Sequence, residues 1–189
     1  MAYTQLKLNG DLQVKMNQAM AEHSASEKTS TSKKQVAIFA DVQNIYYTTR
    51  DAYRRNFDYN AFWALAMEYG DIVSAYAYAI ASQDPKQRQF HHILRGVGFK
   101  VKLKPYIQRA DGSAKGDWDV GITIDIMETA RDVDTIILLS GDGDFELLVR
   151  HVAERYNCNV VVLGVPQLTA NGLIEAASEF IPIKDALLR

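Results

Sequence analysis

Cysteine is nearly absent from this chain of 189 residues, since Cys158 is the one cysteine. A single thiol excludes an internal disulfide framework and a zinc knuckle. Long apolar runs are also absent, and none approaches the roughly 18 residues that a membrane-spanning helix needs. The first ten residues, MAYTQLKLNG, have neither the basic start nor the apolar stretch of a secretory signal. We therefore expect a cytoplasmic protein outside the membrane, with Cys158 as a core residue.

The composition is that of a globular protein, because 48% of the residues are hydrophobic and 23% are charged. These values exclude wholesale disorder and collagen-like structure. The length suits one domain, with or without a tail. Residues 1–34 differ from the rest: an amphipathic piece at 12–20 precedes a stretch rich in Ser, Thr and Lys. We predict that 1–34 form a tail with a linker and that 35–189 form the domain.

The net charge of −2 hides a segregation of charge along the chain. Residues 86–115 hold eight basic side chains and one acidic, or +7, whereas 116–146 hold nine acidic and one basic, or −8. Two ordinary solvated surfaces would explain this pattern, and so would a basic strip that meets polyanions. Charge alone does not decide between them.

Short apolar runs alternate with longer periodic segments from Val36 onward, which predicts strands joined by helical crossovers. The expected strands are 36–40, 72–80, 100–105, 135–139 and 159–163, and the expected helices are 59–69, 85–95, 118–130, 145–156 and 173–177. Asp84 and Pro85 suit the start of the second helix. This order predicts an α/β fold, a three-layer α/β/α sandwich with a mainly parallel central sheet.

The strands differ in their patterns. Those at 36–40, 135–139 and 159–163 are apolar throughout, as in parallel strands buried on both faces. The strand at 100–105 alternates instead, which places Lys100, Lys102 and Lys104 on one face of an edge strand. Those lysines protect the edge or present a basic strip to polyanions, and the pattern fits both.

Acidic residues follow two of the apolar strands. Asp41 ends the first, Asp142 and Asp144 follow the fourth, and Asp119 begins the helix between them. If those strands are neighbours, the carboxylates meet at one rim of the sheet, where ligands of such folds bind. Crowded carboxylates repel unless a cation compensates, and oxygen ligands favour Mg²⁺ or Mn²⁺ over zinc. This set predicts hydrolysis of a phosphate ester.

Each acid also has a purely structural explanation. Asp41, Asp117, Asp142 and Asp144 each stand where a helix N-cap is expected. Asp125 lies six positions after Asp119, hence on another face of the helix, and we expect it to support the site rather than bind metal. It is the joint placement of the acids at strand ends that favours catalysis.

Other catalytic motifs are missing. Ser140 has no G-x-S-x-G elbow around it, the chain has no phosphate-binding G-x-x-x-x-G-K-[ST] loop, and Asp41-Val42-Gln43 lacks the second Asp of aspartyl-phosphate phosphatases. We place His91 and His92 on a solvated helix surface.

Three segments in order resemble the NYN domain, in its LabA-like bacterial branch within the PIN-like nucleases. They are DxxN (Asp41, Asn44), KGxxD (Lys115, Gly116, Asp119) and SGDGDF (140–145). The resemblance spans roughly 36–183 and implies a PIN-like sandwich, a Mg²⁺ or Mn²⁺ site and RNA cleavage. It matches Asp41, Asp119, Asp142 and Asp144 to the family's metal-binding acids, with Asn44, Ser140 and Asp125 in support. Ser178 departs from the family's pattern, since many relatives have Asp there.

The hypothesis is a metal-dependent ribonuclease with those four aspartates at its centre. Candidate RNA contacts are the basic residues Lys102, Lys104, Arg109 and Lys115 and the stacking residues Tyr106 and Trp118. Trp118 has an alternative as a residue packed on the core. A non-catalytic RNA-binding module and a small-molecule phosphohydrolase stay open, and so does a homo-oligomer.

Overall fold

The computed structural model describes residues 33–105, 107–108, 114–115 and 117–189, with 107–108 and 114–115 described by backbone alone. The chain divides into two units, Met1–Lys33 and Lys34–Arg189, and the fold reported below is that of the second. The predicted amphipathic piece at 12–20 lies outside the described residues. None of the described helices is both long and apolar enough to cross a membrane.

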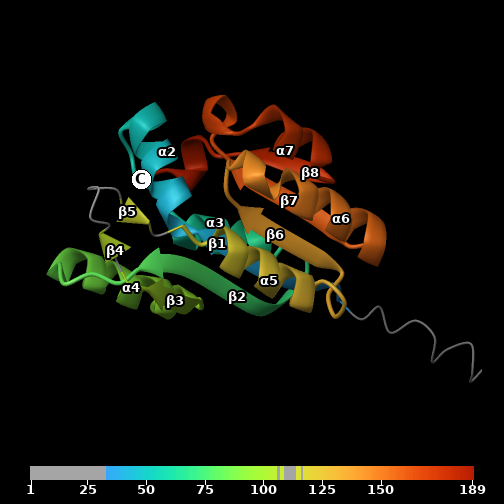
Figure 1. The fold of residues 1–189 in the computed structure, drawn as a ribbon, viewed down its shortest axis with the longest axis horizontal. Helices are drawn as coiled ribbons and strands as arrows, with labels where there is room; N and C mark the ends of the chain where they lie inside the picture. The colour runs from blue at the N-terminus through green and yellow to red at the C-terminus, as the bar shows by residue number, and fades with distance from the viewer. Residues whose placement is uncertain (1–32, 106, 109–113, 116) are drawn as a thin grey trace, which may run out of the picture. The chain divides into compact units, whose positions relative to one another are not determined.

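A six-stranded sheet, all of whose neighbouring strands run parallel, forms the centre of the domain (Figure 1). The strand order is β3-β2-β1-β6-β7-β8. The strands are β1 (Gln35–Asp41), β2 (Asp71–Ile80), β3 (Lys100–Lys104), β6 (Thr135–Leu139), β7 (Asn159–Gly164) and β8 (Glu179–Pro182). All five strands expected from the sequence are present, and β3 lies at an edge as its lysines indicated.

Helices cover both faces of this sheet. On one face lie α2 (Val42–Tyr53), α3 (Tyr59–Ala66) and α4 (Pro85–Val97), and on the other lie α5 (Asp119–Thr129), α6 (Glu146–Tyr156) and α7 (Asn171–Ala176). Figure 1 shows α5 and α6 in front of the sheet. Short 3₁₀ turns are η2 (Gly143–Phe145), η3 (Pro166–Leu168) and η4 (Asp185–Leu187), and β4 (Ile107–Gln108) pairs antiparallel with β5 (Ala114–Lys115). The three-layer α/β/α prediction is confirmed.

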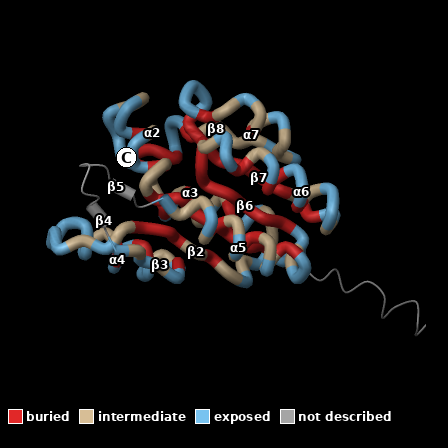
Figure 2. Tube along the Cα trace, in the orientation of Figure 1, coloured by how far each residue is buried: buried red, intermediate tan, exposed pale blue. Residues whose placement is uncertain are grey.

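The core has two layers because alternate residues of each central strand point to opposite faces. In β1, Ile38 belongs to the core cluster with buried residues of α2, α3 and α4, whereas Phe39 belongs to the cluster with those of α5, α6 and α7. Both side chains are fully buried. Figure 2 shows the buried residues concentrated along the central strands, with exposed residues on the outer sides of the helices. The uninterrupted apolar runs therefore do mark strands covered on both faces.

Local interactions determine where helix α4 begins and ends. The Asp84 carboxylate accepts a hydrogen bond from the Lys86 amide at 2.9 Å, and Pro85 occupies the first turn, so the expected cap is confirmed. Gly98 follows the helix with φ of 130°, a conformation that side-chain-bearing residues rarely adopt. A Cβ atom at this position would lie 2.5 Å from the Trp63 ring. Both constraints require glycine there.

The order in which strands are added to the sheet reverses between β1 and β6. The crossovers that build β2 and β3 use one face of the sheet, and those that build β6, β7 and β8 use the other. At such a switch point the two loops leave on opposite faces and open a crevice at the carboxyl ends of the strands. Asp41 ends β1, and Ser140 follows β6 directly. The expected neighbourhood of the first and fourth predicted strands is thus observed.

Candidate metal centre

Asp41 lies at the end of β1 and caps the helix that follows. Its carboxylate accepts a hydrogen bond from the Asn44 amide at 3.1 Å, so the capping interpretation is correct. The residue is 8% exposed, and burial is the main reason that its pKa rises to about 6. Bonds from the Asn44 and Gln43 amides oppose the rise, while the charges of Asp119 and Asp142 add to it. Asp41 therefore also belongs electrostatically to a group of acids.

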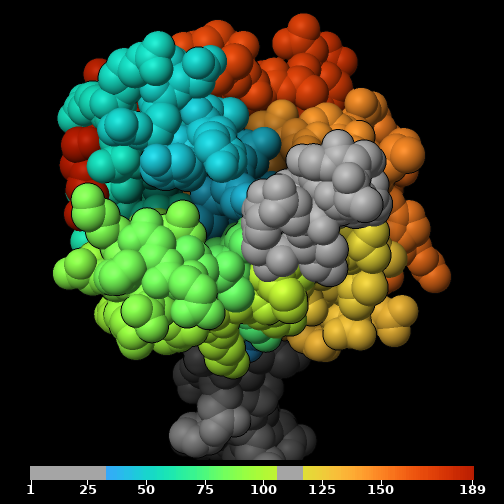
Figure 3. Space-filling view, turned by 60° about the vertical axis from the view of Figure 1, so that its left-hand side comes forward, coloured from blue at the N-terminus to red at the C-terminus, as the bar shows by residue number. Residues whose placement is uncertain are grey.

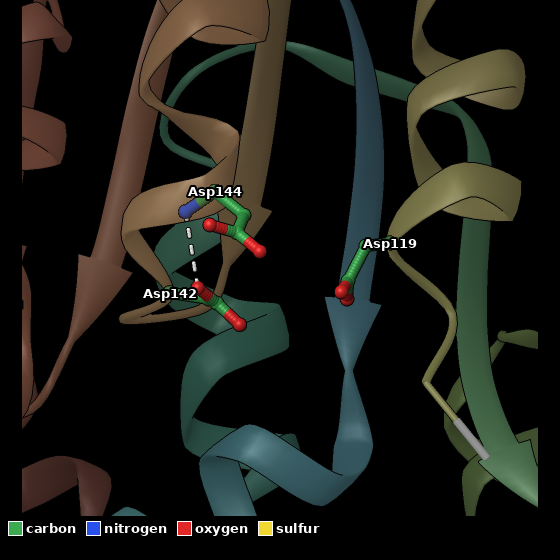
Figure 4. A group of neighbouring side chains, drawn as sticks. All are labelled: Asp119, Asp142 and Asp144. Carbon is green, nitrogen blue, oxygen red and sulfur yellow. Dashed lines mark hydrogen bonds between the residues drawn. The ribbon is translucent and has the colours of Figure 1, made fainter. Parts of the chain in front are cut away.

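Three further carboxylates meet beside it. Asp119, Asp142 and Asp144 each contribute one oxygen to a group whose members all lie within 4.8 Å of one another. Figure 4 shows Asp119, at the start of α5, facing Asp142 and Asp144, which belong to the turn after β6. Segments far apart in sequence thus bring three of the four predicted acids together at the carboxyl end of the sheet, and Asp41 lies outside this group.

The turn that carries Asp142 and Asp144 is held by short polar contacts. The Asp142 carboxylate accepts from the Asp144 amide at 3.0 Å, and the Ser140 hydroxyl accepts from the Asp142 amide at 3.2 Å. The Asn44 side-chain oxygen accepts from the Gly141 amide at 2.9 Å, which joins α2 to this turn. Ser140 is fully buried. Asn44 and Ser140 therefore fix backbone next to the acids.

Repulsion within the group is visible in the pKa of Asp119. Burial raises that pKa most, the charges of Asp142, Asp117 and Asp144 raise it further, and Lys104 lowers it. A divalent cation would relieve this repulsion. The donors are all carboxylate oxygens, the ligands that Mg²⁺ and Mn²⁺ prefer, and no histidine or cysteine is among them. The residues present therefore fit such an ion.

Asp125 makes other contacts. Its carboxylate accepts from the Tyr78 hydroxyl at 2.5 Å and from the Lys102 ammonium at 2.5 Å. The Lys102 side chain is 38% exposed and also lies over the Tyr76 ring, 4.8 Å from its centroid. The Lys102 ammonium is thus paired within the domain. Neither interpretation of the lysines in β3, edge protection or contact with polyanions, predicted this pairing.

Trp118 is packed against the domain. Its indole N–H donates to the Ala79 carbonyl at 2.9 Å, and its ring lies 5.3 Å from that of Tyr78. Lys104 covers the indole at 5.4 Å and donates to the Asp117 carbonyl at 2.8 Å. These contacts match the core-packing alternative for Trp118. Trp118 itself is the residue before α5, so the expectation that Asp117 caps this helix is wrong.

Comparisons with known proteins agree with this geometry. The family model described as "NYN domain" matches residues 35–184. The chain belongs to the NYN domain family. Members of this family are typically nucleases, and PIN-like nucleases usually use divalent metal ions.

Two relatives of this NYN domain are informative. The low amplitude and bright protein LabA of Synechococcus elongatus is 28% identical over 161 residues, which are 79% of this chain and 84% of LabA. The crystal structure of a protein of unknown function from Vibrio parahaemolyticus has 64% sequence identity and a TM-score of 0.81. That match covers 85% of this chain and 99% of the other. The LabA-like resemblance is therefore confirmed.

Three predicted RNA contacts of this NYN domain lie outside the described side chains. Tyr106 and Arg109 lie outside the described residues, and Lys115 is described only as backbone of β5. Their roles stay predictions.

The expectation for His91 is wrong, because this residue is 5% exposed and lies on the buried face of α4, whereas His92 is exposed. The spacing of His91 and Leu94, one helical turn apart on the buried face, is the sequence signal that would have placed it inward. Cys158 is buried, as expected.

Proposed function

We propose that this NYN domain is a Mg²⁺- or Mn²⁺-dependent ribonuclease that hydrolyses phosphodiester bonds of RNA. The observation that carries the proposal is the meeting of Asp119, Asp142 and Asp144 within 4.8 Å, at the crevice between β1 and β6. The membership of a family of nucleases supports the same chemistry.

The four aspartates would hold the cation, with Asp41 facing it from β1 and the other three from α5 and the turn after β6. A bound divalent cation lowers the pKa of an attacking water and offsets negative charge on the phosphoryl group. Asn44 and Ser140 would keep the turn in place through their bonds to the Gly141 and Asp142 amides. Such rigidity preserves ligand positions, on which this chemistry depends.

The basic side chains would contact the phosphates of the RNA backbone. Lys104 lies near Asp119, whose pKa it lowers, and its ammonium would meet a phosphate bound beside the acids. Arg109, Lys115 and Tyr106 would extend this contact along the strand. Lys102 is held by Asp125 and would contribute only after that ion pair opens.

Cleavage of labelled RNA tests the proposal. We expect single-turnover cleavage by the wild type with Mn²⁺, and a loss of at least about a hundredfold in Asp142→Asn because a negatively charged ligand is removed. Glu128→Gln is the matched control, since it removes an exposed acid from α5, and should cleave like the wild type. RNA binding without cleavage would favour the non-catalytic module. Turnover of nucleotides or sugar phosphates without RNA binding would favour the phosphohydrolase.

A further inference from the structure

A cavity of about 670 Å³ lies on the face of the sheet opposite α5. Its lining comes from α2, α4, the start of α3 and the end of β2, and includes Val42, Gln43, Tyr59, Ala79, Phe90 and His91. Figure 3 shows the face on which the residues of α2, coloured blue to cyan, lie against those of α4, coloured green. Cavities of roughly 300–1,000 Å³ are typical of sites for small organic molecules.

Two buried polar side chains in this lining have no hydrogen-bond partner among the described residues: the imidazole of His91 and the hydroxyl of Tyr59. His91 is 5% exposed and Tyr59 is 6% exposed, and both line the cavity. Among the described residues, Ser74 Oγ is the one enclosed side-chain polar atom without a partner, so the polar atoms of His91 and Tyr59 are accessible from the cavity. A molecule that enters the cavity would displace water from these atoms, so its edge needs hydrogen-bonding atoms to replace it.

The walls around these two groups are aromatic. The Tyr59 ring lies 4.9 Å from Phe57 and 5.7 Å from Phe90, and all three residues line the cavity. Burial, with help from Arg95 and His92, lowers the pKa of His91, so its imidazole is neutral at pH 7 and offers one donor and one acceptor. Apolar walls with a donor and acceptor edge suit a flat heteroaromatic ring. A purely aliphatic ligand would leave the polar atoms unpaired.

The charged side chains at the cavity indicate which substituent the bound ring carries. Lys86 and Arg189 line the cavity, are exposed, and make no side-chain ion pair with a described residue. Asp84 also lines it and caps the start of α4, so the lining holds two basic side chains against one acidic side chain, or +1. This positive charge beside an aromatic cavity fits a phosphate attached to the heteroaromatic ring.

The cavity adjoins the acidic group. Val42 and Gln43, the two residues that follow Asp41, are part of its lining. Burial, with a smaller contribution from the Asp41 charge, raises the pKa of Tyr59, so this phenol lies within electrostatic reach of that carboxylate. A ligand in the cavity is therefore next to the proposed cleavage site, on the opposite face of β1 from Asp119.

We propose that this cavity binds a nucleotide, whose base hydrogen-bonds to Tyr59 and His91 and whose phosphate meets Lys86 and Arg189. The nucleotide is either free or a residue of the RNA substrate, and only the second case rests on the proposed function. In that case the cavity selects which nucleotide occupies the position beside the cleaved bond.

Calorimetric titration of the full chain with the four nucleoside 5′-monophosphates, in EDTA, tests the proposal without the metal centre. We expect saturable binding of at least one nucleotide and an affinity about five- to tenfold lower in Tyr59→Phe and in His91→Ala, as for the loss of one hydrogen bond. His92→Ala, on the same helix but exposed, is the matched control and should bind like the wild type. Tyr59→Phe keeps the aromatic packing, so an unchanged melting temperature separates lost binding from lost folding.

A second measurement separates the two sources. If the RNA itself occupies the cavity, Tyr59→Phe and His91→Ala raise KM or change the nucleotide preference of cleavage; if the nucleotide is free, cleavage is unchanged. Asp142→Asn should lose cleavage yet keep nucleotide binding, so failure of the proposed ribonuclease is distinguishable from failure of this site. Absence of nucleotide binding, or equal affinity in the wild type and both variants, would overturn the proposal.

Discussion

Asp41 shows at the scale of one residue how the site sets its own pH dependence. Its pKa rises from an ordinary value of 3.8 to about 6, chiefly by burial. Between these values the folded protein keeps a proton that the unfolded chain has released. The free energy of unfolding without metal therefore falls as pH rises through this window, by up to about 3 kcal/mol. A bound cation would remove much of this cost, because it favours the ionised form.

Asp41→Asn should accordingly stabilise the protein without metal at pH 8, by about 1–3 kcal/mol, because asparagine also caps helices well and carries no charge. The gain should disappear near pH 4, where the wild-type carboxyl is protonated. Urea unfolding in EDTA at both pH values measures it. A loss of stability at pH 8, or an equal effect at both pH values, would contradict the burial argument.

At the scale of the secondary-structure elements, Asp125 joins three of them. Located on α5, it accepts hydrogen bonds from Tyr78 of β2 and Lys102 of β3, so a helix is tied to the edge of the sheet. Burial, followed by the bond to Asp125, raises the pKa of Tyr78, which keeps the hydroxyl a donor. The contacts of Trp118 lie directly beside this connection, since its ring packs on Tyr78.

Tyr78→Phe should lower the free energy of unfolding by about 1.5–3 kcal/mol, the range for a hydrogen bond to a charged group. Tyr76→Phe is its control, because Tyr76 lies two residues away on the same face of β2 and its hydroxyl makes no hydrogen bond with a described residue. Urea unfolding of the two variants gives the comparison. Equal losses would mean that the bond to Asp125 contributes nothing.

Two glycine substitutions test what ends helix α4. Gly98→Ala should destabilise the protein by about 2 kcal/mol or more, because alanine resists a φ of 130° and its Cβ would meet the Trp63 ring. Gly96→Ala should instead stabilise it by roughly 0.5–1 kcal/mol, since a Cβ there meets nothing within 4 Å and alanine favours helix. Thermal unfolding measures both. Effects of the same sign would refute this account of the helix terminus.

At the scale of the whole molecule, the sequence predicts those strands and site residues that have a strong local pattern. The strands β1, β6 and β7 were predictable because they are apolar throughout, and the neighbourhood of the acids after β1 and β6 followed from the common rim of a parallel sheet. Asp41 was expected as a helix cap, but the range of α2 was not among the predicted helices because VQNIYYTTRDAY is rich in β-branched and aromatic residues that form helices weakly. Packing of Ile45 and Thr49 and the Asp41 cap stabilise this helix. Strand β8 was missed because it has four residues and ends in proline.

The rest of the site could not be predicted because it depends on contacts between distant segments. The lysines of β3 alternate in sequence as a free edge would, yet Lys102 is paired with Asp125, and nothing in the spacing reveals that partner. Tyr59 and His91 likewise come from different helices and share one cavity only after folding. Likewise, the near-neutral total charge conceals an acidic group at the end of the sheet.

The central claim is that these acids hold a divalent cation. A crystal structure with Mn²⁺, recorded at a wavelength where manganese scatters anomalously, tests it most directly. The account predicts an anomalous peak within coordination distance of carboxylate oxygens of Asp119 and Asp142, absent from crystals of Asp142→Asn grown in the same conditions. A map without a peak among Asp41, Asp119, Asp142 and Asp144 at saturating Mn²⁺ would contradict it.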